Sequence, residues 1–128
     1  DFIMATRMMH NMLRWGVIDR EFQALGKLLK PGGLVGIEQH RAQNDAPDAY
    51  VDGSKGYLKE SQVIAIMERN GFELVARSEI NANPKDPANH AEGVWTLPPA
   101  MRGASEADKP RLEAIGESDR MTMLFRKK

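Results

Sequence analysis

The sequence contains no cysteine among its 128 residues. Disulfide bonds, thiolate nucleophiles and cysteine-ligated zinc or iron–sulfur sites are therefore excluded within it. It also contains no apolar run near the roughly 18 residues that cross a bilayer, so we expect no transmembrane helix. Its 18 basic residues are matched by 18 acidic ones, which removes any overall attraction to nucleic acid or to anionic lipid. We expect neither as a partner.

The composition that remains, 41% hydrophobic and 28% charged, is typical of one small soluble domain. The chain opens on Asp1 and then an apolar run, without an initiator methionine or a basic leader. This start is typical of the middle of a strand. We therefore expect residues 1–128 to be the C-terminal portion of a single domain whose N-terminal half lies upstream. We expect the cytoplasm as its compartment, with the periplasm as the alternative.

Four short apolar runs predict strands. They cover residues 2–5, 34–37, 72–76 and 120–126. The first three are joined through helical segments and suit right-handed parallel crossovers. No helix stands at the right place before the last run, which predicts an antiparallel pairing for it. The pattern as a whole predicts an α/β fold with a mixed sheet.

Apolar residues at helical spacing predict helices at residues 18–29 and 61–70, with a shorter one at 109–115. Asp19 is the expected N-cap of the first helix. Gly71 stands where a left-handed C-terminal cap is expected after the second.

Two irregular stretches, residues 41–59 and 81–109, are long for a compact domain, and such loops are commonly active-site lids. Tyr57 and Trp95 lie in these stretches. We predict that they line a substrate pocket; the alternative is that each anchors its loop to the core.

A parallel α/β sheet closed by an antiparallel last strand resembles the C-terminal half of class I, Rossmann-like methyltransferases. FQALGKLLKPGG at residues 22–33 resembles the helix and turn before their fifth strand. ESQVIAIMERNGF at residues 60–72 resembles the helix leading into the sixth strand. SDRMTMLFRK at residues 118–127 resembles the seventh strand of a bacterial group known only as predicted methyltransferases.

That bacterial group also has a short polar motif after its fourth strand, which His10-Asn11 resembles. It has a histidine at the end of its fifth strand, which His40 resembles. It has an Asn-Pro-x-Asp word that matches residues 83–86. The resemblance therefore implies strands four to seven of the family fold, flanking helices, S-adenosylmethionine as cofactor and a small-molecule acceptor.

The glycine-rich first loop and the acidic residue that hold the cofactor in this fold class have no counterpart in residues 1–128. The adjacent Gly32 and Gly33 precede a strand, whereas a cofactor-cradling loop follows one. We therefore expect these residues alone to be inactive. Two alternatives stay open: another Rossmann-like enzyme, such as a nicotinamide-dependent reductase, and a non-catalytic association module.

Ligands of open α/β sheets bind beyond the carboxyl ends of the strands. His10 follows the first expected strand, and Glu38 and His40 end the second. A neutral imidazole accepts a proton near neutral pH, and residues two apart in a strand point the same way, so all three are candidate catalytic residues. The alternatives are a buried His10 bonded to a backbone carbonyl, and a solvent-edge position for Glu38 and His40.

Thr6, Arg7 and Asn11 trail the first expected strand and are candidates for binding the cofactor. Arg41, with Tyr57 and Trp95, is a candidate for binding the substrate, and Arg7 is a second candidate for an acidic substrate. The three histidines have no helical metal-ligand spacing, so we expect no metal site. An unpaired apolar edge at residues 2–5 predicts a homodimer formed through that edge.

Overall fold

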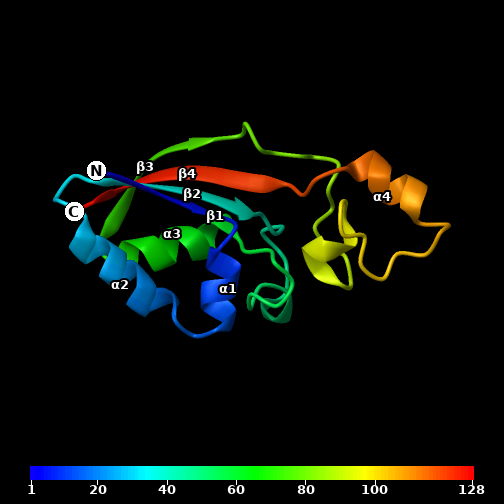
Figure 1. The fold of residues 1–128 in the computed structure, drawn as a ribbon, viewed down its shortest axis with the longest axis horizontal. Helices are drawn as coiled ribbons and strands as arrows, with labels where there is room; N and C mark the ends of the chain where they lie inside the picture. The colour runs from blue at the N-terminus through cyan, green and yellow to red at the C-terminus, as the bar shows by residue number, and fades with distance from the viewer.

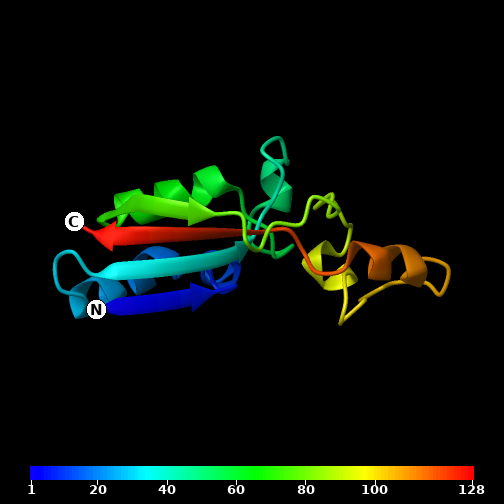
Figure 2. The ribbon, with the colours of Figure 1, turned by 90° about the horizontal axis from the view of Figure 1, so that it is seen from above.

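The computed structural model describes residues 1–128 and contains one four-stranded mixed sheet. Its strands run in the order β1-β2-β4-β3 (Figures 1 and 2). They are β1 (Phe2–Thr6), β2 (Leu34–His40), β3 (Phe72–Ser78) and β4 (Arg120–Lys127). β1 pairs with β2 in parallel, and β4 is antiparallel to both β2 and β3. The predicted α/β fold with an antiparallel last strand is confirmed.

β4 lies between β2 and β3, so these two strands share no hydrogen bonds although they run in the same direction. The helices and short 3₁₀ segments are α1 (Met9–Arg14), α2 (Ile18–Leu28), η1 (Asp48–Tyr50), α3 (Glu60–Arg69), η2 (Gly93–Thr96) and α4 (Lys109–Ile115). α1, α2 and α3 lie on one side of the sheet, and α4 stands apart, beyond the end at which β4 begins (Figure 1). The longest helix has 11 residues, and none is long and apolar enough to cross a membrane.

The main core lies between the sheet and the three helices. Phe22 of α2 and Phe72 of β3 are fully buried, and their rings meet edge to face with centroids 6.4 Å apart. Ile37 and Met123 face the same core from β2 and β4. The helices and the strands thus bury their apolar faces in one common core, because the side-chain period of each element puts its apolar residues on one side. Packing in this core holds the strand ends in position.

The cap predicted at Asp19 is wrong. α2 begins after Val17, and no side chain caps it. Asp19 lies in the first turn and instead accepts hydrogen bonds from Arg69 (2.7 Å) and Asn70 (2.8 Å) at the end of α3. The two donors come from a helix 50 residues away in the sequence. Because the Asp19 carboxylate binds them, it does not cap its own helix. Gly71 has φ +90° after α3, as predicted.

The opposite face of the sheet carries no helix (Figure 1). Phe2 and Met4 of β1 are exposed there, at 59% and 50%. With Gly36 and Leu124 they line a shallow groove of about 270 Å³. β1 is also an edge strand, so the outer edge of the sheet and an apolar surface lie together.

Candidate functional site

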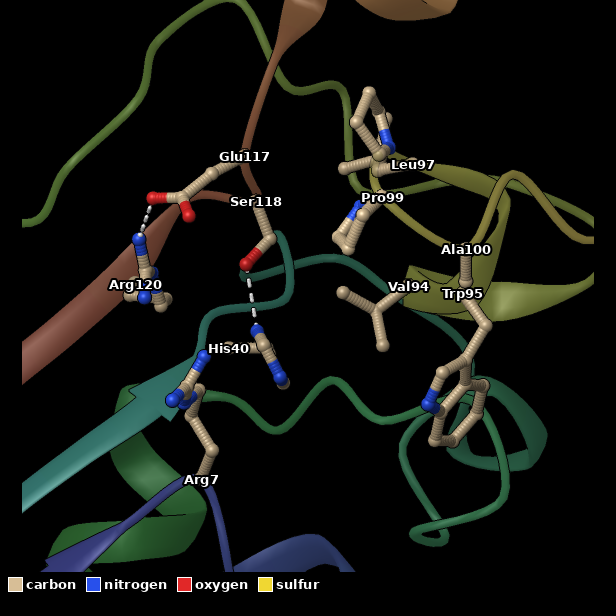
Figure 3. A pocket seen from close by; sticks show the side chains of 11 residues that line it. Arg7, His40, Val94, Trp95, Leu97, Pro99, Ala100, Glu117, Ser118 and Arg120 are labelled. Atoms are coloured by element: carbon tan, nitrogen blue, oxygen red, sulfur yellow. Dashed lines mark hydrogen bonds and ion pairs between the residues drawn. The ribbon is translucent and has the colours of Figure 1, made fainter.

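A cavity of about 640 Å³ opens beyond the carboxyl ends of the two parallel strands, the usual place for a ligand in this class of sheet. It is lined by Arg7, His10, Asn11, Arg14, His40, Ser54, Lys55, Glu92, Trp95 and Arg102. A second cavity of about 200 Å³ shares Arg7, His40 and Trp95 with it (Figure 3). The two spaces therefore meet around His40.

The two long loops of the chain close the cavity by packing against each other. Val94 N–H donates to the Lys55 carbonyl at 2.9 Å. Gly93 has φ +77°, and a Cβ there would lie 2.5 Å from the same carbonyl oxygen. Glycine is needed because a side chain would force the loops apart. This contact holds the loop whose Trp95 ring packs against His10 of α1.

His10 lies in the first turn of α1, the helix that follows β1, and is 4% exposed. Its Nδ1 lies 3.2–3.3 Å from the Gln39 carboxamide, and Gln39 Nε2 donates to the Gly56 carbonyl at 2.7 Å. Burial lowers the pKa of His10, against the opposing hydrogen bond with Gln39. His10 is thus a buried neutral imidazole that borders the larger cavity, held by a side-chain amide.

His40 ends β2, and its Nδ1 lies 2.6 Å from Ser118 Oγ (Figure 3). Its ring centroid is 5.7 Å from that of His10 and 6.1 Å from that of Tyr57. Burial, followed by the nearby His10, Arg120 and Arg7, lowers the pKa of His40 to about 3. The imidazole is therefore neutral at physiological pH. Its Nε2 has no hydrogen-bond partner in the chain and is left for a ligand.

Glu38 lines neither cavity. Its carboxylate accepts a hydrogen bond from Arg120 Nη1 at 2.8 Å and is largely buried. Arg120 itself borders the smaller cavity. The structure thus brings His10 and His40 together as expected, whereas Glu38 reaches the site only through Arg120.

Of the three residues predicted to bind the cofactor, Arg7 and Asn11 line the larger cavity and Thr6 does not. Arg7 has φ +54°, an uncommon backbone conformation for a residue other than glycine. Its N–H donates to the Glu38 carbonyl at 2.6 Å, which holds the turn in place. Asn11 accepts from Arg14 through Oδ1, and its Nδ2 has no partner in the chain.

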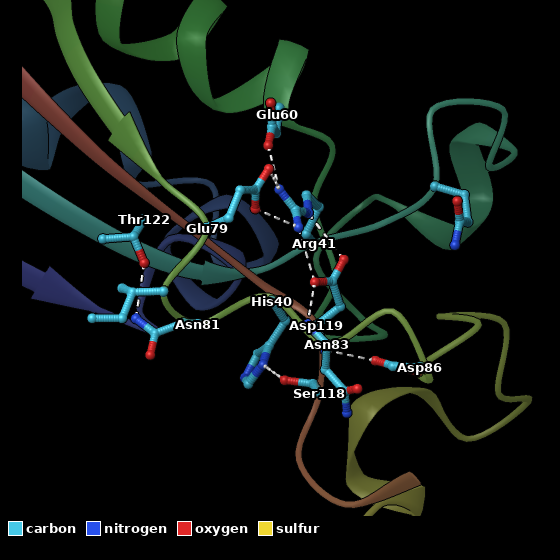
Figure 4. A network of polar contacts seen from close by, with 12 residues as sticks. His40, Arg41, Glu60, Glu79, Asn81, Asn83, Asp86, Ser118, Asp119 and Thr122 are labelled. Carbon is cyan, nitrogen blue, oxygen red and sulfur yellow. Dashed lines mark hydrogen bonds and ion pairs between the residues drawn. The ribbon is translucent and has the colours of Figure 1, made fainter.

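Arg41 is not part of either cavity. Its guanidinium binds Asp119 through two hydrogen bonds of 2.9 Å, Glu60 at 2.6 Å and Glu79 at 2.9 Å (Figure 4). These carboxylates raise the pKa of Arg41, with Asp119 contributing most. Arg41 therefore ties β2, α3 and the start of β4 together and has no donor left for a substrate.

Tyr57 and Trp95 have different environments. Tyr57 is fully buried and donates to Asp86 Oδ2 at 2.7 Å, so it anchors its loop, in line with the alternative to pocket lining. Trp95 borders both cavities. Its ring meets His10 edge to face at 5.9 Å, and the Arg102 guanidinium lies 5.5 Å above it.

Sequence reasoning did not single out Lys55, Arg102 or Ser118. All three lie in loops or at a loop end, where no periodic pattern marks a residue that faces a cavity. The length and polarity of the two long loops was the one signal that pointed to Lys55 and Arg102, and Ser118 lies outside both loops. No group of His, Asp and Glu side chains is arranged to hold a metal ion.

No family model and no curated protein matches this sequence. Solved structures that share its fold include the following two. The cyclase SpnF superposes with a TM-score of 0.59 at 17% identity, and a SAM-dependent methyltransferase from Methanosarcina mazei with 0.55 at 12% identity. Each match covers 99% of this chain but 49% and 58% of the other, so the chain spans about half the length of these proteins. The fold is methyltransferase-like.

Proposed function

We propose that the chain is part of an S-adenosylmethionine-dependent methyltransferase that acts on a small-molecule acceptor. The observation that carries the proposal is the mixed sheet, with its cavity at the carboxyl ends of β1 and β2, in a fold shared with a SAM-dependent methyltransferase. Because another protein with this fold is named a cyclase, the fold does not fix the reaction. The site residues must therefore carry the remaining support.

The residues on the cofactor side fit a polar ligand in one respect. Asn11 faces the cavity with an unpartnered Nδ2, a donor suited to the carboxylate or ribose oxygens of S-adenosylmethionine. The cofactor, when bound, supplies a methyl group from its sulfonium. No glycine-rich loop follows a strand in residues 1–128. Asn11 would therefore supply only part of the cofactor site.

His40 is the residue best placed to orient an acceptor. The low pKa keeps its imidazole unprotonated, and Ser118 fixes the ring through Nδ1. Nε2 then accepts a hydrogen bond from the acceptor nucleophile, and methyl transfer depends on such alignment. His10 lies beside His40, and Trp95 packs against His10, so the three rings border the space in which the acceptor would lie.

The test uses the complete gene product that contains these residues. We expect S-adenosylmethionine to bind at micromolar concentration in isothermal titration calorimetry, and residues 1–128 alone to bind it more weakly. Loss of one orienting hydrogen bond costs about 1–3 kcal/mol, which corresponds to a roughly ten- to hundredfold loss of turnover. We expect that loss in His40→Gln, with cofactor affinity unchanged.

The control pair is Trp95→Leu and Trp15→Leu. Trp95 borders both cavities, whereas Trp15 is 59% exposed and lines neither. Only the first variant should raise the acceptor KM. A complete gene product that binds no S-adenosylmethionine contradicts the proposed function. Normal turnover in both His40→Gln and His10→Gln removes the histidines from catalysis.

A further inference from the structure

We propose that the larger cavity binds an oxyanion, a phosphate or carboxylate group, carried by a small organic molecule. Four cationic side chains line it, Arg7, Arg14, Lys55 and Arg102, against a single carboxylate, that of Glu92. The chain as a whole has no net charge. The positive charge in the cavity therefore arises because folding brings these four side chains together. Such a surface attracts an anion.

Two of these cations have no partner. Arg7 and Arg102 make no side-chain hydrogen bond and no ion pair, and the Arg102 guanidinium rests on the Trp95 ring. Each of the other eight arginines binds an oxygen of a neighbouring side chain. Both free guanidinium groups therefore lie in the same cavity, where their planar donors suit an oxyanion.

The other two cations are held but not neutralised. Lys55 Nζ donates to the Ala91 carbonyl at 2.7 Å, and Arg14 Nη2 donates to Asn11 Oδ1 at 2.9 Å. Both acceptors are uncharged, so both positive charges remain available to a ligand. Glu92 is exposed and forms no ion pair with any of the four. The ligand itself would supply the missing negative charge.

The smaller cavity defines the rest of the molecule. Its walls include Val94, Leu97 and Pro98, and it joins the larger cavity at His40. A molecule with its oxyanion among the arginines extends over His40 toward this less polar recess. Its identification as the methyl acceptor rests on the proposed function, whereas oxyanion binding does not.

The test is a titration of the isotope-labelled chain with inorganic phosphate and, separately, with acetate, followed by amide NMR at constant ionic strength set by chloride. We expect shifts at Arg7–Asn11, at Lys55 and at the Trp95 indole. Hydrogen bonds between charged groups are worth about tenfold in affinity or more. Arg7→Gln and Arg102→Gln should therefore each weaken binding about tenfold.

Arg20→Gln is the matched control, because Arg20 is exposed and outside the cavity. It should leave the affinity unchanged. Arg7 has no side-chain partner to lose, so Arg7→Gln should have the same melting temperature as the parent chain. Arg102→Gln also removes the contact with Trp95. If that disturbs the loop, Arg102→Lys is the second variant, because it keeps the positive charge. Tighter binding of phosphate indicates a phosphorylated molecule and tighter binding of acetate a carboxylic acid. Binding of neither, or equal weakening by Arg20→Gln, overturns the inference whether or not the protein binds S-adenosylmethionine.

Discussion

Asp86 carries the most heavily bonded carboxylate in the chain, and Asp86→Asn should destabilise the fold strongly. Oδ2 accepts from the Tyr57 hydroxyl (2.7 Å) and from Asp119 N–H (2.9 Å). Oδ1 accepts from Ala88 N–H (2.9 Å) and contacts His90 Nε2 at 3.0 Å. The side chain is fully buried. One carboxylate thus joins both long loops to the start of β4.

An asparagine at this position must turn an NH₂ group toward one of these donor pairs. The Tyr57 hydroxyl can rotate and accept, but the backbone N–H of Asp119 cannot. The variant therefore leaves a buried N–H without a partner, at roughly 1–3 kcal/mol, and weakens the other hydrogen bonds by removing the charge. We expect a total loss of about 3–4 kcal/mol, a large part of the roughly 5–15 kcal/mol that stabilises a typical domain.

Urea denaturation followed by circular dichroism measures this loss. Asp45→Asn is the control, because Asp45 is exposed and has no bonded partner, and it should change the free energy of unfolding by less than about 0.5 kcal/mol. A loss below about 1 kcal/mol for Asp86→Asn would refute the proposed role of this carboxylate.

The pH dependence provides an independent check. Burial acts to raise the pKa of Asp86, but the hydrogen bonds from His90, Asp119 and Ala88 outweigh it and hold the pKa below its ordinary value. A carboxyl with a lowered pKa stabilises the fold above its unfolded pKa of about 3.9. That contribution is lost as the pH falls through the folded pKa. The gap between parent and Asp86→Asn should therefore narrow below about pH 4.

Three further predictions concern other parts of the molecule. Arg41→Met leaves the partly buried Asp119 without its counter-ion and leaves Glu60 with only the more exposed Arg77. We expect urea denaturation to show a loss of about 2–4 kcal/mol, and a change under about 1 kcal/mol would exclude this role. His40 has a pKa of about 3 in the folded chain, whereas a histidine in the unfolded chain has a pKa of about 6.5. Below about pH 6.5 the unfolded chain therefore takes up a proton that the folded chain does not, and the free energy of unfolding should fall as the pH drops. A His40 imidazole that titrates near pH 6.5 by NMR contradicts this. The exposed edge and apolar face around Met4 should make the chain dimerise, with Met4→Glu shifting it to monomer in sedimentation velocity; a parent chain that stays monomeric at micromolar concentration removes that proposal.

The strands and the helices other than α1 follow from local patterns that the chain carries without its neighbours. Apolar residues recur at the helical period in α2 and α3, and short apolar runs mark all four strands, because burial on one face imposes those periods. α1 was not predicted, because its six residues are too few to show a helical period. The antiparallel last strand also followed from sequence, from the absence of a suitably placed helix before it.

The candidate site was only partly predictable. The histidines that follow two neighbouring parallel strands could be placed together, because the carboxyl ends of such strands share one edge of the sheet. Their partners could not, since Ser118 lies 78 residues from His40 and Gln39 lies 29 from His10.

The arginines show most clearly what the tertiary structure decides. By sequence, Arg7 and Arg41 are both candidates for an acidic ligand. Folding brings Glu60 and Asp119, 19 and 78 residues away, onto Arg41, and brings no carboxylate onto Arg7. The residue type and the strand end are local properties that the sequence by itself determined. Whether a guanidinium is neutralised depends on which distant carboxylates the fold brings within a few ångströms of it, because Coulomb and hydrogen-bond energies act over that distance in space and take no account of separation along the chain.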